Sequence, residues 1–120
     1  MRVFKYTGFS RFADKEGITD SELKEMVNQL EAGQADADLG GGVYKVRVAR
    51  SGEGKSGGYR VIVFFKSEKR TFYVYGFAKS VMGNINEKQL RDFKRTAKAV
   101  LALTEKQLDD VLKTGKYLEI

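Results

Sequence analysis

The apolar residues of this chain recur with two different spacings, which separate strand-like from helix-like segments. Four segments alternate between apolar and polar residues, or are almost continuously apolar, and are expected to be β-strands. They are residues 3–6, 43–50, 59–66 and 71–79. Three other segments repeat apolar residues at the three- and four-residue intervals of a helix that packs one face on a core. They begin near Thr19, Asn86 and Thr104.

Each predicted helix begins at a residue that can cap its first turn. Thr19, Asn86 and Thr104 are each followed three residues later by a glutamate or glutamine, which is the spacing of a capping box. Gly33 and Gly115 are placed to end the first and the last of these helices, because glycine readily adopts the left-handed conformation found there.

The remaining segments are expected to be connections. Phe9 and Phe12 fall in a turn or short helix, and residues 35–42, which end in three glycines, form a loop. Residues 67–70 are so few that only a hairpin can form, so neighbouring strands are expected to be antiparallel. The order β-α-β-β-β-α-α predicts an α+β fold, in which an antiparallel four-stranded sheet packs with helices and residues 1–120 form one domain.

The residue types that are missing exclude several kinds of chemistry. The 120 residues include no cysteine and no histidine, so disulfides, the usual zinc sites and nucleophiles activated by histidine cannot form. The longest purely apolar run, residues 61–65, is far shorter than the roughly 20 residues that span a bilayer. The N-terminus also lacks the apolar stretch of a signal peptide. We therefore expect a cytoplasmic protein without a metal or other cofactor.

Positive charge is concentrated in the middle of the chain. Residues 1–44 contain 5 Lys and Arg against 8 Asp and Glu, whereas residues 45–79 contain 9 against 2 and residues 80–120 contain 8 against 6. The middle segment alone exceeds the net charge of the whole protein, which is +6. Such a concentration attracts polyanions, although a lysine-rich sheet edge that only prevents aggregation has a similar composition. The glycines and aromatic residues beside the charges favour a polyanion site.

Lys45 and Arg47 are the first candidate ligands of a polyanion. They lie two residues apart on a predicted strand, so both side chains leave the same face, while Tyr44, Val46 and Val48 face the core. Adjacent cations on an exposed face repel each other unless an anion binds there, and the planar guanidinium group suits phosphate.

Arg60 and Lys79 are further candidates, because each stands at one end of a largely apolar strand. A half-buried arginine most often pairs with a carboxylate, but the only acids between Lys45 and Lys79 are Glu53 and Glu68. This scarcity predicts that the partner of Arg60 is an anion of the ligand.

The glycine-rich segment of residues 51–58 resembles a phosphate-binding P-loop only superficially. One residue separates Gly52 from Gly54-Lys55, where a P-loop has four, and a strand follows where a P-loop opens a helix. A hairpin tip is the better interpretation, with Arg50 and Lys55 able to grip a nucleic-acid backbone.

The aromatic residues of this region are either core or a surface on which bases stack. Tyr73, Tyr75 and Phe77 alternate on the same predicted face as Lys79, and such stripes are more often core. Tyr59 is a separate stacking candidate, although its spacing relative to the apolar residues that follow it favours packing. Tyr59, Tyr75 and Phe77 are the aromatic candidates for RNA binding.

Two runs of the sequence resemble a known protein family. They are GGVYKVRVARSGEGKSGGYRVIVFF and FYVYGFAK, and they are similar to the RelE/ParE toxin superfamily, in particular its HigB-like, phage-related branch. The resemblance is close over about residues 40–90 and extends to the flanking helices by their order and length. It implies a type II toxin that cleaves mRNA on the ribosome, and a cognate antitoxin, of the helix-turn-helix type in this branch.

By position, Lys45, Arg47, Arg60 and Lys79 match the basic catalytic residues of that family. The resemblance implies metal-independent cleavage, in which a lysine deprotonates the ribose 2′-hydroxyl and Arg60 stabilises the phosphorane. Another cation assists the leaving 5′-oxygen, and a 2′,3′-cyclic phosphate is the product. The chain departs from many relatives directly after Lys79, where Ser-Val replaces Arg-Glu or Asn-Glu, and it has no tyrosine within residues 84–90.

Two other functions stay open at this point. A ParE-like protein shares the fold and inhibits DNA gyrase without cutting RNA, but such chains usually lack the four basic residues. A simple nucleic-acid-binding module needs only the basic charge and the aromatic residues. For a toxin, an acidic antitoxin segment would complement the basic stretch. The apolar faces of the last two helices are assigned to the core, because their width is normal for packed helices.

Overall fold

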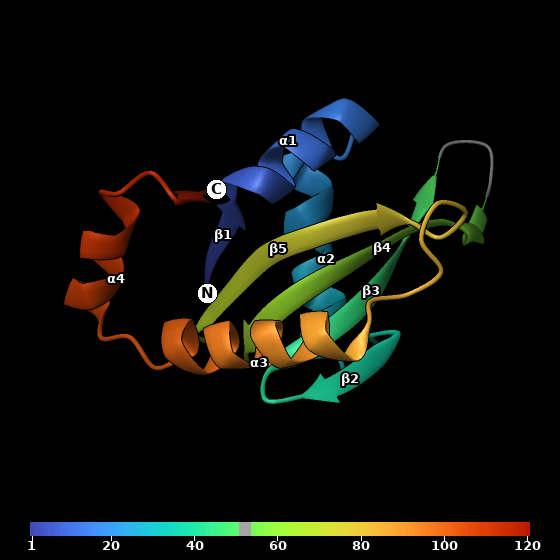
Figure 1. The fold of residues 1–120 in the computed structure, drawn as a ribbon. Coiled ribbons are helices and arrows are strands. Elements are labelled where there is room, and N and C mark those ends of the chain that lie inside the picture. The colour runs from blue at the N-terminus through green and yellow to red at the C-terminus, as the bar shows by residue number, and fades with distance from the viewer. Residues whose placement is uncertain (51–53) are drawn as a thin grey trace.

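The computed structural model describes the backbone of residues 1–50 and 54–120 and the side chains of residues 1–49 and 58–120. In this part, six strands form one sheet: β1 Arg2–Tyr6, β2 Ala37–Gly40, β3 Val43–Arg50, β4 Gly54–Lys66, β5 Arg70–Ala78 and β6 Tyr117–Glu119. The described helices are α1 Thr7–Glu16, α2 Asp20–Glu31, α3 Glu87–Leu101 and α4 Glu105–Leu112. The strands follow the order β2-β3-β4-β5-β1-β6 across the sheet (Figure 1).

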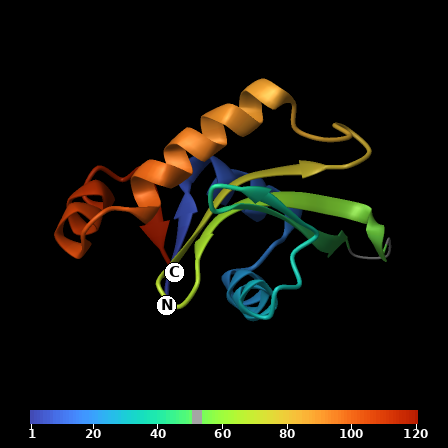
Figure 2. The ribbon, with the colours of Figure 1, turned by 90° about the horizontal axis from the view of Figure 1, so that it is seen from below.

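The helices lie on opposite faces of the sheet. Residues of α1 and α2, such as Leu23, pack on one face against the alternate β4 residues that include Val61. Residues of α3 and α4, such as Ala97 and Leu108, pack with Ile62 and its neighbours on the other face. Figure 2 shows the sheet between α3 on one side and α2 on the other. The apolar faces of the two C-terminal helices therefore belong to the core, as the sequence predicted.

Helix boundaries agree closely with the capping signals in the sequence. All three predicted capping boxes are present, with reciprocal side-chain and backbone hydrogen bonds. They are the pairs Thr19–Glu22, Asn86–Gln89 and Thr104–Gln107. Gly33 and Gly115 have positive φ angles of 72° and 77° just beyond α2 and α4. Of the two structures predicted for the segment around Phe9, a turn or a short helix, the helix is the one observed, with 10 residues.

The α+β class is confirmed, but the predicted antiparallel four-stranded sheet and element order were wrong. The sheet is mixed, because β1 pairs with β5 in parallel, and β6 adds an antiparallel strand beyond β1. β2 falls within the predicted loop and pairs with the start of β3. The two missed strands have 4 and 3 residues, too few to display a period of their own. Only tertiary pairing defines them.

A β-bulge in β5 sends its aromatic residues to different faces. Tyr73 and Tyr75 pair with adjacent residues of β4, so Val74 between them is an unmatched, extra residue. Tyr73 therefore enters the core beneath α1 and α2, where its hydroxyl donates to the Leu23 carbonyl at 2.5 Å. Tyr75 and Phe77 lie on the α3 face. The prediction of one common face was wrong for Tyr73.

The three consecutive glycines connect β2 to β3 in a tight turn. Residues 40–42 all have positive φ angles, of 89°, 63° and 83°. A Cβ atom on Gly42 would lie 2.5 Å from Cδ1 of Leu101, so the turn packs directly against the end of α3. The positive φ angles favour glycine here, and a Cβ on Gly42 would displace the end of the Leu101 side chain.

Candidate functional site

Three of the four predicted catalytic cations converge on one face of the sheet. Arg47 and Arg60 are directly opposite each other on β3 and β4, and Lys45 is two residues from Arg47, opposite Ile62. This is the face on which Ile62 and Phe64 pack against the residues of α3. Like charges that face each other across two strands destabilise a sheet unless an anion lies between them.

The anion is the carboxylate of Asp36, one residue before β2. Its Oδ1 lies 2.7 Å from Nε of Arg47, and its Oδ2 lies 3.9 Å from Nζ of Lys45 and 4.0 Å from Nε of Arg60. The exposed fraction of the side chain is 5% for Arg60, 15% for Asp36, 17% for Lys45 and 49% for Arg47. These four residues are termed the Asp36 cluster. A ligand from solvent would meet Arg47 first.

The prediction that the partner of Arg60 is an anion of the ligand was wrong, because Asp36 lies in ion-pair range of its guanidinium. Asp36 precedes the stretch from Lys45 to Lys79 and is brought to the cations by the β2–β3 hairpin. The pairing of Ala37 with Lys45 brings the two segments together. The one available signal was an aspartate shortly before a tight glycine turn, because such a turn folds the preceding residues back along the next strand.

Lys79 directly follows β5, two residues beyond the position that pairs with Arg60 of the Asp36 cluster. Its amide nitrogen donates to the Gly58 carbonyl at 3.4 Å, and Phe77, two residues earlier, pairs with Arg60. The Lys79 side chain is exposed, unlike that of Arg60. The backbone of the fourth predicted catalytic cation is therefore near that of Arg60, and its side chain is accessible from solvent.

The three aromatic candidates for RNA binding differ in accessibility. Tyr59 is buried on the opposite face, where its ring packs edge-on against Phe12 and its hydroxyl donates to Glu16. Phe77 is buried on the cation face. Tyr75 is half-buried, and its hydroxyl lies 3.7 Å from the sulfur of Met82. The burial of Tyr59 and Phe77 leaves neither ring open to a stacked base, and Tyr75 is the one of the three with an accessible surface.

The side chains of Arg50 and Lys55, the predicted backbone grips, lie outside the described residues. The backbone of Arg50 pairs with Gly54, so β3 and β4 continue as a hairpin to these positions. β4 begins at Gly54, which confirms that a strand and not a helix follows the glycine-rich segment. The P-loop interpretation is thereby excluded.

Part of the positive charge between residues 45 and 79 is structural. Arg70 is buried at the far end of β5, where it donates to the carbonyls of Val100 and Leu103 at 3.1 and 2.9 Å and pairs with Glu105. Carbonyls at the end of a helix carry partial negative charge and favour a cation there. The candidate basic surface is therefore smaller than the charge count of the sequence indicates.

Arg2 forms a second structural ion-pair group, which joins β1 to α4 and β6. Its guanidinium lies 2.6 Å from Glu105, 3.2 Å from Asp109 and 2.9 Å from Glu119. Hydrogen bonds from Arg2 lower the pKa of the Glu105 and Glu119 carboxyl groups below the ordinary value of 4.5. This group stabilises the edge of the sheet and is remote from the Asp36 cluster.

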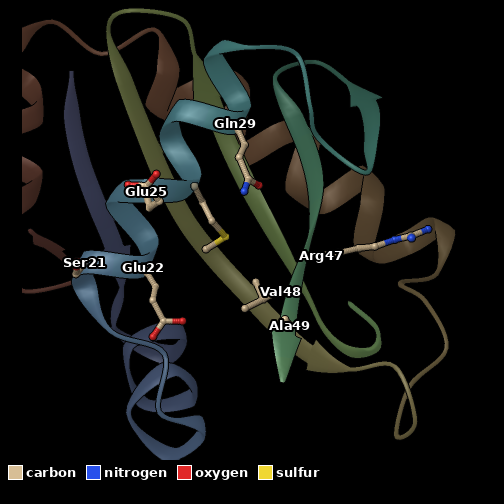
Figure 3. Close-up of a pocket in the computed structure, with 8 residues that line it drawn as sticks. Ser21, Glu22, Glu25, Gln29, Arg47, Val48 and Ala49 are labelled. Atoms are coloured by element: carbon tan, nitrogen blue, oxygen red, sulfur yellow. The ribbon is translucent and has the colours of Figure 1, made fainter. Parts of the chain in front are cut away.

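A groove of about 320 Å³ lies between α2 and β3 (Figure 3). It is lined by apolar atoms of Met26 and Val48 and bordered by Glu22 and Glu25. Arg47 also borders it, but Figure 3 shows its side chain extending from β3 away from α2. The groove and the Asp36 cluster are therefore on different sides of β3, and the acidic border does not suit a polyanion.

Within residues 1–50 and 54–120, none of the helices combines the length and the apolar character required to cross a membrane. Comparison with protein-family models matches residues 1–120, the whole chain, to the family described as the RelE toxin of the RelE / RelB toxin-antitoxin system.

Proposed function

Because this chain belongs to the RelE toxin family of toxin–antitoxin systems, we propose that it is a ribosome-dependent mRNA endoribonuclease of the HigB-like branch. The observation that carries the proposal is the convergence of Lys45, Arg47 and Arg60 on one sheet face, with the exposed Lys79 two residues beyond the β5 position that pairs with Arg60. Among the described side chains, three cations there lie in ion-pair range of one carboxylate, that of Asp36, and such an arrangement suits a phosphate.

The proposed reaction needs no metal and no histidine. A lysine amine, from Lys45 or Lys79, accepts the proton of the ribose 2′-hydroxyl, and the 2′-oxygen attacks the adjacent phosphorus. The bond from phosphorus to the 5′-oxygen breaks, and a second ammonium group donates a proton to that oxygen. Arg47 and Arg60 stabilise the negative charge of the phosphorane. The products are a 2′,3′-cyclic phosphate and a free 5′-hydroxyl.

The two arginines would contribute differently, because their accessibility differs. Arg47 is half-exposed and can contact a phosphate oxygen directly. Arg60 is buried and is held near Asp36 and the Tyr59 carbonyl, so its charge acts mainly through the low-dielectric interior. We therefore choose Arg47 and Lys79, rather than the buried Arg60, for substitutions that test chemistry without removing a core side chain.

The test is cleavage of a defined mRNA in a reconstituted translation reaction, with the cut mapped by primer extension. The wild-type protein is expected to cut only ribosome-bound mRNA, and Arg47→Ala and Lys79→Ala are expected to lower the rate by about 100-fold each. Lys69→Ala is the matched control, because it removes one exposed charge in the turn at the far end of β4. Arg60→Ala is expected to abolish cleavage, provided that circular dichroism shows a folded protein.

Other outcomes would favour other functions. RNA binding without any cleavage would support a nucleic-acid-binding module, and inhibition of DNA supercoiling by purified gyrase would support a ParE-like inhibitor. The proposal also includes a cytoplasmic location and a cognate antitoxin of the helix-turn-helix type. A small adjacent reading frame that encodes such a protein, and whose product blocks the cleavage, is the expected finding.

A further inference from the structure

The most unusual feature of the basic site is the carboxylate already inside it. Arg47 and Arg60 form a directly opposed cross-strand pair of like charges, with Lys45 on the same face. Asp36 is 15% exposed and is in ion-pair range of all three. The Asp36 carboxylate therefore offsets part of the repulsion among three cations on one face of the sheet.

The two oxygens of the Asp36 carboxylate face different cations. One carboxylate oxygen accepts a hydrogen bond from Arg47 at 2.7 Å, and the other faces Lys45 and Arg60 at 3.9 and 4.0 Å. The latter distances are ion-pair contacts, longer than a hydrogen bond. Two oxygens of a phosphate could form ion pairs with the same cations from the position of the carboxylate, but only after the carboxylate has left it.

Asp36 can leave this position without disrupting the sheet. It lies in the connection between α2 and β2, and the β2–β3 ladder begins one residue later, at Ala37. Rotation of its side chain therefore breaks ion pairs but no strand hydrogen bond. A phosphate that replaced the carboxylate would restore the lost ion pairs, so the exchange changes little in the number of ion pairs that the cations make.

We propose that Asp36 is an internal counter-anion that occupies the phosphate position of the basic site and is displaced when an RNA phosphate binds. It keeps Lys45, Arg47 and Arg60 assembled in the free protein, and it weakens RNA binding by competing for the same cations. Asp36 is thus a positioning residue and a determinant of affinity. The identity of the anion as RNA rests on the proposed function, whereas the exchange itself rests on the ion pairs of Asp36.

The experiment measures binding of a fluorescein-labelled, single-stranded 2′-O-methyl RNA by anisotropy, because that oligonucleotide has no 2′-hydroxyl and cannot be cleaved. Asp36→Asn keeps the shape of the side chain and removes its charge. It is expected to bind about five- to tenfold more tightly than wild type, since one unit charge at about 4 Å has an effect of this size even at the dielectric constant of water. The gain is expected to shrink as salt rises from roughly 0.1 to 1 M.

Asp38→Asn is the matched control, because it changes the net charge equally, two residues away. Asp38 is exposed and accepts a hydrogen bond from the Gly40 amide, which asparagine can also accept. It is expected to change the affinity less than twofold. Equal affinities of the two variants, or weaker binding by Asp36→Asn, would overturn the proposal, because a purely structural aspartate gives one of these results.

A second measurement uses only the wild-type protein and covers the case in which Asp36→Asn does not fold. The ¹³Cγ NMR signal of Asp36 is expected to move on addition of the oligonucleotide, as the carboxylate leaves the cations for solvent. An unchanged signal at saturation would overturn the exchange. Cleavage on the ribosome with no effect of Asp36 on affinity would refute only this inference. The Asp36 effect without ribosome-dependent cleavage would refute only the proposed nuclease function.

Discussion

The β-bulge in β5 makes a sharp prediction about two neighbouring tyrosines. Tyr73 is fully buried beneath α1 and α2, and its hydroxyl donates to the Leu23 carbonyl at 2.5 Å. Tyr75 is half-buried on the opposite face, and its hydroxyl lies 3.7 Å from the weakly accepting sulfur of Met82. Without the bulge, both side chains would share one face. Removing each hydroxyl in turn therefore tests whether the two tyrosines lie on opposite faces of the sheet.

Tyr73→Phe keeps the ring, which stacks on Phe9 with 5.7 Å between centroids, and removes one buried hydrogen bond. Such a bond contributes about 1 to 1.5 kcal/mol to the free energy of unfolding. For a domain of this size the melting temperature should fall by about 3 to 6 °C. Tyr75→Phe is expected to cost less than about 0.5 kcal/mol, because its hydroxyl has a weak partner and access to solvent.

The assay is urea unfolding followed by circular dichroism, with the midpoint and the m value fitted for each variant. A lower midpoint with an unchanged m value is the expected result for Tyr73→Phe. Equal losses for the two variants, or a larger loss for Tyr75→Phe, would refute the assignment of the two tyrosines to opposite faces.

Three further predictions concern the glycine turn, the Arg2 ion pairs and alkaline stability. Gly42→Ala should lower the free energy of unfolding by about 1 to 3 kcal/mol in urea titrations, because its φ of 83° is strained for alanine and the new Cβ must displace the Leu101 side chain of α3. Gly83→Ala, with nothing within 4 Å of its Cβ, is the control, and equal effects would contradict the role of the turn. Glu105 and Glu119, two of the carboxyl groups paired with Arg2, have a lowered pKa in the folded protein, so their stabilisation is present above the ordinary value of 4.5 and is lost as pH falls. Arg2→Met should therefore flatten the loss of stability between about pH 5 and pH 3, and an unchanged acid profile would argue against these pairs. Burial raises the pKa of Tyr73 above its ordinary 10.0, so above that pH the tyrosine ionises more readily in the unfolded chain than in the folded protein. The free energy of unfolding of the wild-type protein should therefore fall relative to that of Tyr73→Phe as pH rises above 10.0, and a difference that stays constant from pH 8 to pH 11 would contradict the burial of the Tyr73 hydroxyl.

The helices could be predicted accurately because their signals are local. The capping boxes at Thr19, Asn86 and Thr104 set the starts of α2, α3 and α4 within a residue of the structure. The hairpin between β4 and β5 could also be predicted from the sequence, since its turn is short. Interactions within about four residues, and the alternation of one strand, are sufficient for such features.

The sheet edges and the faces of the aromatic residues could not be predicted in the same way. The parallel pairing of β1 with β5 joins segments nearly 70 residues apart, as in Arg2↔Arg70. The extra residue Val74 has no sequence signature, yet it moves Tyr75 to the face opposite Tyr73. A bulge depends on how two strands fit together, and that fit is a property of the pair.

For the candidate site, the sequence by itself determined which cations of one strand share a face, and it predicted a polyanion as their ligand. Lys45 and Arg47 are two residues apart on one strand, and strand geometry alone places both on the same side. Only the tertiary structure decided what lies between them. The β2–β3 hairpin carries Asp36 to the cations, and β4 sets Arg60 directly opposite Arg47. The physical reason is that side-chain direction follows from the local backbone, whereas the partner of a charge depends on which distant segments the fold brings within about 4 Å.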